Sequence, residues 1–183
     1  MAFTALIGIA GAIILVVGAA LPDTPVKHAR QSLKDWFFAL GGAVMLLCSI
    51  LNYVAGGAIF FIFLQVLVNI ASIFMMLDVN DRIGAPLIAV AGAAFILWSI
   101  LLYQGMNTIF FIIGLSGIGM GYVMTTGTVR REVALTVGSV LIALFSYKEG
   151  NLIFFWLNAF FAIFSFYYIY KNWQRDAGKG KNR

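Results

Sequence analysis

Residues 84–103 have the sequence GAPLIAVAGAAFILWSILLY, twenty consecutive positions without a charged side chain. An α-helix rises about 1.5 Å per residue, so a run of this length matches the roughly 30 Å hydrocarbon core of a bilayer. Further uncharged runs lie on both sides of it. Together they predict seven membrane-spanning helices, at residues 3–21, 36–54, 58–77, 84–103, 107–126, 133–147 and 151–170.

The composition agrees with a membrane protein and excludes several other classes. The chain has 183 residues, of which 62% are hydrophobic and 10% are charged, whereas a soluble domain is about half apolar and a quarter charged. A soluble enzyme, a nucleic-acid-binding domain and a secreted disulfide scaffold are therefore excluded. Cys48 is the only cysteine and His28 the only histidine, so we expect no internal disulfide, metal site or cofactor. The common catalytic motifs are also absent, and we expect no enzymatic activity.

Positive charges lie almost entirely on one side of the predicted membrane. Of the 12 Lys and Arg residues, all but Lys148 follow the first, third, fifth or seventh run. Because short cytoplasmic connections are enriched in Lys and Arg, this bias predicts an N-terminus outside and a C-terminus in the cytoplasm. The expected location is the cytoplasmic (inner) membrane of a bacterium or archaeon. We expect one domain over residues 1–175, followed by a disordered cytoplasmic tail at 176–183.

The first run has an alternative interpretation as a cleaved signal peptide. Gly18-Ala19-Ala20 resembles a small-residue cleavage site. However, no basic segment precedes the run, and its positive charges follow it. We therefore expect a retained span, followed by a surface loop from Pro22 to Asp35.

A repeated pattern divides the rest of the chain into three similar units. At three places a tyrosine is followed six residues later by Ile-Phe-Phe, and a small residue stands twelve positions after the isoleucine. The copies are Tyr53 with 59–61 and Ala71, Tyr103 with 109–111 and Gly121, and Tyr147 with 153–155 and Ser165. Aromatic residues collect at membrane interfaces, which explains the residue types but not the equal spacing. We interpret the pattern as three tandem helical hairpins, at about 36–81, 84–131 and 132–175, preceded by one helix.

The third hairpin resembles a known family. Residues 137–141 (VGSVL) and 147–151 (YKEGN), with Asn158 and Trp173 on the following run, are similar to the closing hairpin of the Pnu-type vitamin transporters. The first hairpin has a similar pattern in Gly41-Gly42, Tyr53, Gly56-Gly57, Gln65 and Asn69.

This resemblance implies a fold and a function. Pnu-type proteins take up nicotinamide riboside and related precursors, which are trapped by chemistry in the cytoplasm. Their fold is similar to that of the SWEET sugar transporters, in which two three-helix bundles surround a linker helix. The middle hairpin departs from this arrangement, because it repeats the other two hairpins.

Polar side chains inside the runs are the candidate contacts for a solute, because an unpaired polar group is costly in hydrocarbon. Gln65, Asn69 and Ser72 are separated by four and three positions, which places them on one helical face. Amides hydrogen-bond sugar hydroxyls or a carboxamide, and aromatic faces stack on a flat ring. The predicted substrate-binding residues are Gln65, Asn69, Ser72, Trp98, Ser116, Trp156 and Asn158. For each of them the alternative is a contact between helices.

Charged residues at the cytoplasmic ends of the runs are candidates for a gate. Ion pairs between these connections would close the cytoplasmic side. The predicted gate residues are Asp78, Asp81, Arg82, Arg130, Arg131 and Glu132. The alternative is that they are solvated helix ends whose charge sets the topology.

The fifth run is rich in glycine, at positions 114, 117, 119 and 121. Small residues allow membrane helices to approach closely, so this run predicts a packing face. The alternative is a hinge or a break in the helix near a substrate.

No Asp, Glu, Lys or Arg lies near the centre of a run, so the sequence offers no proton relay and no charge to couple transport to a gradient. We therefore expect a facilitator for a small neutral solute, with a vitamin precursor such as nicotinamide riboside as the most specific candidate. The expected partners are this solute and membrane lipids; a homo-oligomer and a larger complex both stay open. The alternative function is a structural or accessory subunit of a larger membrane complex.

Overall fold

The structure is a computed structural model that describes residues 2–21, 32–125 and 127–180. These residues form seven α-helices and no strand, which confirms the predicted all-α class. The helices are α1 Ala2–Ala20, α2 Leu33–Val54, α3 Phe60–Met76, α4 Asp81–Leu101, α5 Met106–Val123, α6 Val129–Lys148 and α7 Leu152–Gly180. Each predicted run corresponds to one helix. Most of the loop predicted between Pro22 and Asp35 lies outside the described residues.

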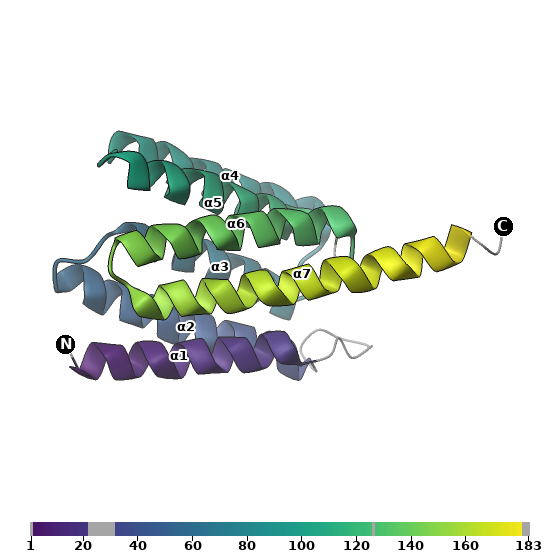
Figure 1. The fold of residues 1–183 in the computed structure, drawn as a ribbon, viewed down its shortest axis with the longest axis horizontal. Helices are drawn as coiled ribbons and strands as arrows, with labels where there is room; N and C mark the ends of the chain where they lie inside the picture. The colour runs from purple at the N-terminus through teal and green to yellow at the C-terminus, as the bar shows by residue number, and fades with distance from the viewer. Residues whose placement is uncertain (1, 22–31, 126, 181–183) are drawn as a thin grey trace.

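The helix α7 is longer than its predicted span. It continues to Gly180 and so includes most of the segment predicted as a tail. Lys, Arg and Gln at its end are good helix formers, which allows the helix to continue past the apolar run. Figure 1 shows this end of α7 projecting beyond the other helices.

The helical surfaces are those of an integral membrane protein. Five helices, α1, α2, α4, α5 and α7, are long and apolar enough to cross a membrane. The other two helices differ from these five. The helix α3 is apolar but shorter, with 17 residues, and α6 carries charged residues in its first turn and Lys148 at its end. Large apolar side chains face outward, among them Phe3, Leu101 and Phe166, which are 71%, 84% and 65% exposed. Lipid tails are a favourable surrounding for such surfaces, whereas water is not.

Six of the helices pack in a ring. Consecutive contacts join α1 to α2, α2 to α3, α3 to α5, α5 to α6 and α6 to α7, and α7 returns to α1. The helix α4 packs on α3 and α5 outside this ring (Figure 1). We call the end of the bundle where α1 and α3 end, and where α2 and α6 begin, the mouth end. The opposite end is called the closed end.

Glycines allow α5 and α6 to pack backbone against backbone. A Cβ atom added to Gly138 would lie 2.7 Å from the Ile118 nitrogen and 2.8 Å from the Gly114 oxygen, and one added to Gly117 would lie 2.9 Å from the Gly138 Cα. Real Cβ atoms do not approach backbone atoms this closely, so this crossing requires glycine. At Gly8 of α1 the close neighbours are side chains, Cys48 of α2 and Ile153 of α7, at 2.7 Å and 2.9 Å from an added Cβ. Without a hydrophobic driving force in lipid, such close packing is a main source of helix association.

The three repeated segments occupy similar places in the structure. Each Ile-Phe-Phe lies at the closed end, close to the start of α3, α5 or α7. The turns that precede these helices contain Gly56, Gly105 and Gly150, with φ of 93°, 117° and 69°. Such left-handed backbone angles favour glycine, which explains the tight connections between the two helices of each hairpin.

Candidate solute-binding cavity

A cavity of about 510 Å³ lies inside the ring of helices. Residues of α1, α2, α3, α5, α6 and α7 line it, and α4 contributes none. On α7 the lining extends from Leu157 and Asn158 to Lys171 and Asn172. At 1.5 Å per residue this face is about 20 Å long, a large part of the roughly 30 Å hydrocarbon core of a bilayer.

The cavity is open at the mouth end and ends in a buried floor. Near the mouth end its lining includes Lys34 and Asp35, which are half-buried, and Lys171, which is exposed. The deepest lining residues, Leu64, Gln65 and Leu157, are each 2% exposed. The cavity therefore connects the surface at the mouth end with the interior of the bundle.

The floor carries neutral polar groups from three helices. Gln65 of α3, Ser139 of α6 and Asn158 of α7 are 2%, 4% and 5% exposed. Nδ2 of Asn158 donates to the Phe154 oxygen at 2.8 Å, which leaves its Oδ1 as an acceptor. Oε1 of Gln65 is buried without a hydrogen-bond partner in the described part of the chain. A buried amide oxygen without a partner costs about 1–3 kcal/mol, so a hydrogen-bond donor that reaches Oε1 of Gln65 would be favourable there.

Polar residues on α7 continue this lining toward the mouth end. Asn158, Ser165 and Asn172 are separated by seven positions, or two helical turns, and all three line the cavity while being at most 8% exposed. Aromatic residues complete the walls at Phe38, Phe161, Phe164, Tyr122 and Tyr168. The cavity thus offers hydrogen-bonding groups together with flat apolar faces, the usual combination in small-molecule sites.

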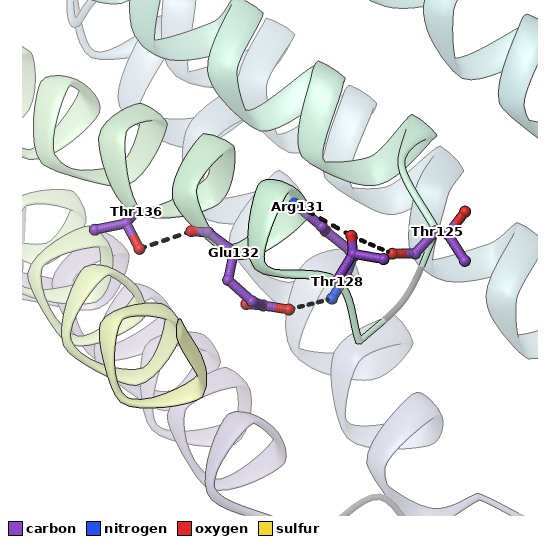
Figure 2. Close-up of polar contacts among 5 residues, drawn as sticks. All are labelled: Thr125, Thr128, Arg131, Glu132 and Thr136. Atoms are coloured by element: carbon purple, nitrogen blue, oxygen red, sulfur yellow. Dashed lines mark hydrogen bonds and ion pairs between the residues drawn. The ribbon is translucent and has the colours of Figure 1, made fainter. Parts of the chain in front are cut away.

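Charged groups occur at the mouth end of the cavity, where α6 begins. The Thr128 hydroxyl caps this helix by accepting from the Arg131 nitrogen at 3.4 Å, and the Arg131 guanidinium pairs with the Glu132 carboxylate at 2.9 Å (Figure 2). Both residues line the cavity, and Glu132 is 5% exposed. Because the two charges are opposite, the pair adds no net charge to the cavity wall.

Two lysines flank the ring of Tyr168 at the same end. Nζ of Lys34 lies 5.5 Å and Nζ of Lys171 lies 6.0 Å from the ring centroid. Both distances are within the range of cation–π contacts. The contact of Lys34 joins α2 to α7 across the mouth of the cavity.

The structure brings some of the predicted binding residues to the cavity and leaves others outside its lining. Gln65 and Asn158 lie in the floor. Nδ2 of Asn69 instead donates to the Gly42 oxygen at 3.0 Å and to the Gln65 oxygen at 2.7 Å, so it joins α3 to α2. Ser72 is fully buried, and its Oγ has no hydrogen-bond partner among the described residues. Oγ of Ser116 donates to the Ile112 oxygen at 2.7 Å within α5.

The two predicted tryptophans lie on the outer surface of the bundle. Trp98 of α4 is 53% exposed and Trp156 of α7 is 57% exposed. Neither lines the cavity. Trp98 contacts Phe63 with ring centroids 5.5 Å apart, and Trp156 contacts Phe160 at 6.3 Å.

The predicted gate residues are distributed around the mouth end. Asp78, Asp81, Arg82 and Arg130 are exposed. Asp78 has a φ of 53° and lies in the turn that ends α3. Among the six predicted residues the structure pairs Arg131 with Glu132, which are neighbours on one helix and do not connect two loops.

Several cavity residues are not among the sequence predictions, namely Tyr122, Tyr168 and Asn172. The sequence holds one signal that points to Asn172. Asn158, Ser165 and Asn172 recur every seven residues along α7, which is the spacing of one helical face.

Comparison of the chain with protein-family models, with characterised proteins and with solved structures finds no match. Its function therefore has to be inferred from the cavity.

Proposed function

We propose that this protein is a membrane facilitator for a small neutral solute. The observation that carries the proposal is the cavity of about 510 Å³ with uncharged hydrogen-bonding groups in its floor. Its volume lies within the range of about 300–1,000 Å³ that is typical of small-molecule sites. A bundle that served only to pack helices would not need such a space in its interior.

The groups around the cavity favour a particular class of solute. The floor amides of Gln65 and Asn158 offer donors and acceptors, and Phe161 and Tyr168 offer faces for a flat ring. A solute with a ring, a carboxamide and several hydroxyls satisfies both kinds of group. Nicotinamide riboside carries these groups, in agreement with the resemblance to Pnu-type transporters, but its pyridinium ring also carries a positive charge. A neutral solute with the same kinds of group, such as riboflavin, fits the proposal better.

The proposed topology places the mouth end in the cytoplasm. In this orientation α3 and α6 cross the membrane together with the five longer helices, and the N-terminus lies outside. The positive residues of the described loops and helix ends then lie on the cytoplasmic side, apart from Lys148. The mouth of the cavity faces the compartment in which chemical trapping would keep the solute.

Ligand-dependent thermal stabilisation in detergent tests whether the cavity binds a solute. A ligand that binds only the folded state raises the melting temperature by mass action. We expect a shift with riboflavin or another ring-bearing neutral solute at millimolar concentration, and none with a charged solute of similar size. The Gln65→Leu variant should lose the shift, whereas Gln104→Leu, the same change at an exposed position outside the cavity, should keep it.

A flat response of the folded protein to nicotinamide riboside, thiamine, riboflavin and several sugars would contradict solute binding. The accessory-subunit alternative would then be favoured. Purification in mild detergent, followed by identification of co-purified proteins, would test that alternative directly.

A further inference from the structure

Five phenylalanine rings form a connected cluster beyond the cavity floor. We call them the aromatic layer; they are Phe60, Phe61, Phe111, Phe145 and Phe154. Each is at most 2% exposed. Ring centroids are 4.5 Å apart for Phe61 and Phe154 and 5.0 Å apart for Phe60 and Phe111. The Phe145 ring lies at 5.2 Å, 5.4 Å and 5.7 Å from those of Phe111, Phe61 and Phe60.

The layer lies directly on the closed-end side of the floor. Phe61 precedes Gln65 by one helical turn on α3, and Phe154 precedes Asn158 by one turn on α7. One turn corresponds to a distance of about 6 Å. On α6, which runs in the opposite direction, Phe145 follows Ser139 toward the closed end.

The layer is also the last part of the bundle before the closed-end surface. Phe60 is the first residue of α3, Phe154 is the third of α7, and α6 ends three residues after Phe145. The next segments are the turns that contain Gly56 and Gly150. One layer of aromatic side chains therefore separates the cavity floor from the exposed turns at the closed end.

We infer that the aromatic layer is the barrier that a solute must pass between the cavity and the closed end, and that it determines which solutes pass. This inference rests on the proposed function. Four of the five rings come from the repeated Ile-Phe-Phe segments, so the repeat supplies the barrier from three different hairpins. Phe145 contacts three of the other rings and is the central member.

The chemistry of the layer predicts its selectivity. Phenyl rings offer no hydrogen-bonding group to replace the hydration shell of an ion, so an ion meets a barrier of unsolvated apolar surface. A neutral solute loses less solvation there, and its ring can slide along the phenyl faces.

Reaction of a floor cysteine from each side of the membrane tests the barrier. The background is Cys48→Ala, and the reporter is Ser139→Cys, a small change at a lining position. The probe is a membrane-impermeant, positively charged methanethiosulfonate reagent, added to right-side-out and inside-out vesicles of the host membrane. Asp81→Cys and Glu149→Cys, each exposed and at opposite ends of the bundle, report which end faces the reagent.

With the layer intact we expect the Ser139→Cys reporter to react from the mouth end and to be protected from the closed end. Adding Phe145→Ala should raise the closed-end reaction rate by at least about tenfold, because a gap replaces the central ring of a hydrophobic constriction. Phe145→Leu should give a smaller increase in this rate. Because leucine fills more of the space than alanine, this variant replaces Phe145→Ala in the test if the alanine variant does not fold. Phe166→Ala, the same change at a lipid-facing position of α7, should have no effect.

Two results would overturn the inference. One is rapid reaction from the closed end with the layer intact, and the other is unchanged protection in a folded Phe145→Ala or Phe145→Leu variant. The proposed function can fail while the barrier holds. In that case the protein moves no solute, yet the Ser139→Cys reporter is still protected from the closed end and loses this protection in the Phe145→Ala variant.

Discussion

At the scale of single residues, Gln65 and Asn69 show how one helical face serves two purposes. They are four positions apart on α3, yet Gln65 lines the cavity whereas Asn69 donates to the Gly42 oxygen of α2 at 3.0 Å. A Cβ on Gly42 would lie 3.0 Å from Oδ1 of Asn69, so the glycine and the asparagine fit each other closely. We therefore expect substitution of Gln65 to affect solute binding and substitution of Asn69 to affect stability.

Gln65→Leu is expected to weaken solute binding with little loss of stability. The change removes a buried amide whose Oε1 lacks a partner in the described residues, which offsets the lost polar contacts. Binding should weaken by at least about tenfold, since one hydrogen bond of about 1.5 kcal/mol corresponds to that factor. Titration of the solute by thermal shift, alongside the melting temperature without solute, measures both quantities. A stable variant with unchanged affinity would exclude Gln65 from the site.

Asn69→Ala is expected to destabilise the bundle. The Gly42 oxygen loses its donor from α3, and hydrogen bonds between membrane helices contribute about 0.6–2 kcal/mol. The affinity of the remaining folded protein for solute should change by less than about twofold, because Asn69 does not line the cavity. Reversible unfolding in mixed micelles gives the stability. An affinity loss like that of Gln65→Leu would instead make Asn69 part of the binding site.

The sequence identifies Gln65 and Asn158 as binding candidates because an amide is conspicuous in an apolar run. It does not identify the position of Trp98 or Trp156 relative to the cavity. In these helices apolar side chains cover both the lipid face and the core, so hydrophobic periodicity does not indicate which face is interior. The direction of Trp156 depends on the ring closure between α7 and α1, which is a contact between the two ends of the chain, and that of Trp98 depends on how α4 packs on α3 and α5.

At the scale of helices, the glycines of α5 differ in what surrounds them. A Cβ on Gly117 would meet the Gly138 Cα of α6 at 2.9 Å, whereas one on Gly119 would meet only a methyl group of Leu67 at 3.7 Å. Glycine composition predicts a packing face on this helix. Which of the glycines form it depends on the rotation of α5 against α6, which the sequence does not specify.

These two glycines form a matched pair of tests. Gly117→Ala should lower stability, because backbone atoms of α6 have to move, at a cost of about 1–3 kcal/mol. Gly119→Ala should be neutral or stabilising by up to about 1 kcal/mol, since alanine favours the helix more than glycine does. Melting temperatures of the two variants in the same detergent compare them directly. Equal effects of the two substitutions would mean that α5 and α6 do not cross at Gly117.

At the scale of the whole molecule, seven helices and three hairpins follow from the sequence alone. Uncharged runs define the helices, and the equal spacing of the Ile-Phe-Phe segments defines the hairpins. The position of α4 outside the ring was not predictable from the repeat, because its hairpin resembles the other two. The cavity too depends on long-range packing among six helices, which no local pattern records.

The orientation in the membrane is expected to be N-out and C-in. Cysteines introduced at Asp81 and at Glu149, in the Cys48→Ala background, should be labelled by an impermeant maleimide from opposite sides. In intact cells Glu149→Cys should react and Asp81→Cys should not, because positive charge gathers at the cytoplasmic end. The reverse pattern would place the mouth of the cavity outside and would contradict uptake with cytoplasmic trapping.

Solute flux into proteoliposomes tests the central claim most directly. Purified protein, reconstituted into vesicles without any ion gradient, should admit riboflavin or another ring-bearing neutral solute faster than protein-free vesicles, with saturation at high concentration. Flux should stop at equal concentrations on both sides, since the floor residues Gln65, Ser139 and Asn158 offer no charge for coupling to a gradient. Gln65→Leu should lower the flux at low solute concentration and Gln104→Leu should not. The absence of flux for every tested solute, with the folded protein correctly inserted, would contradict a facilitator.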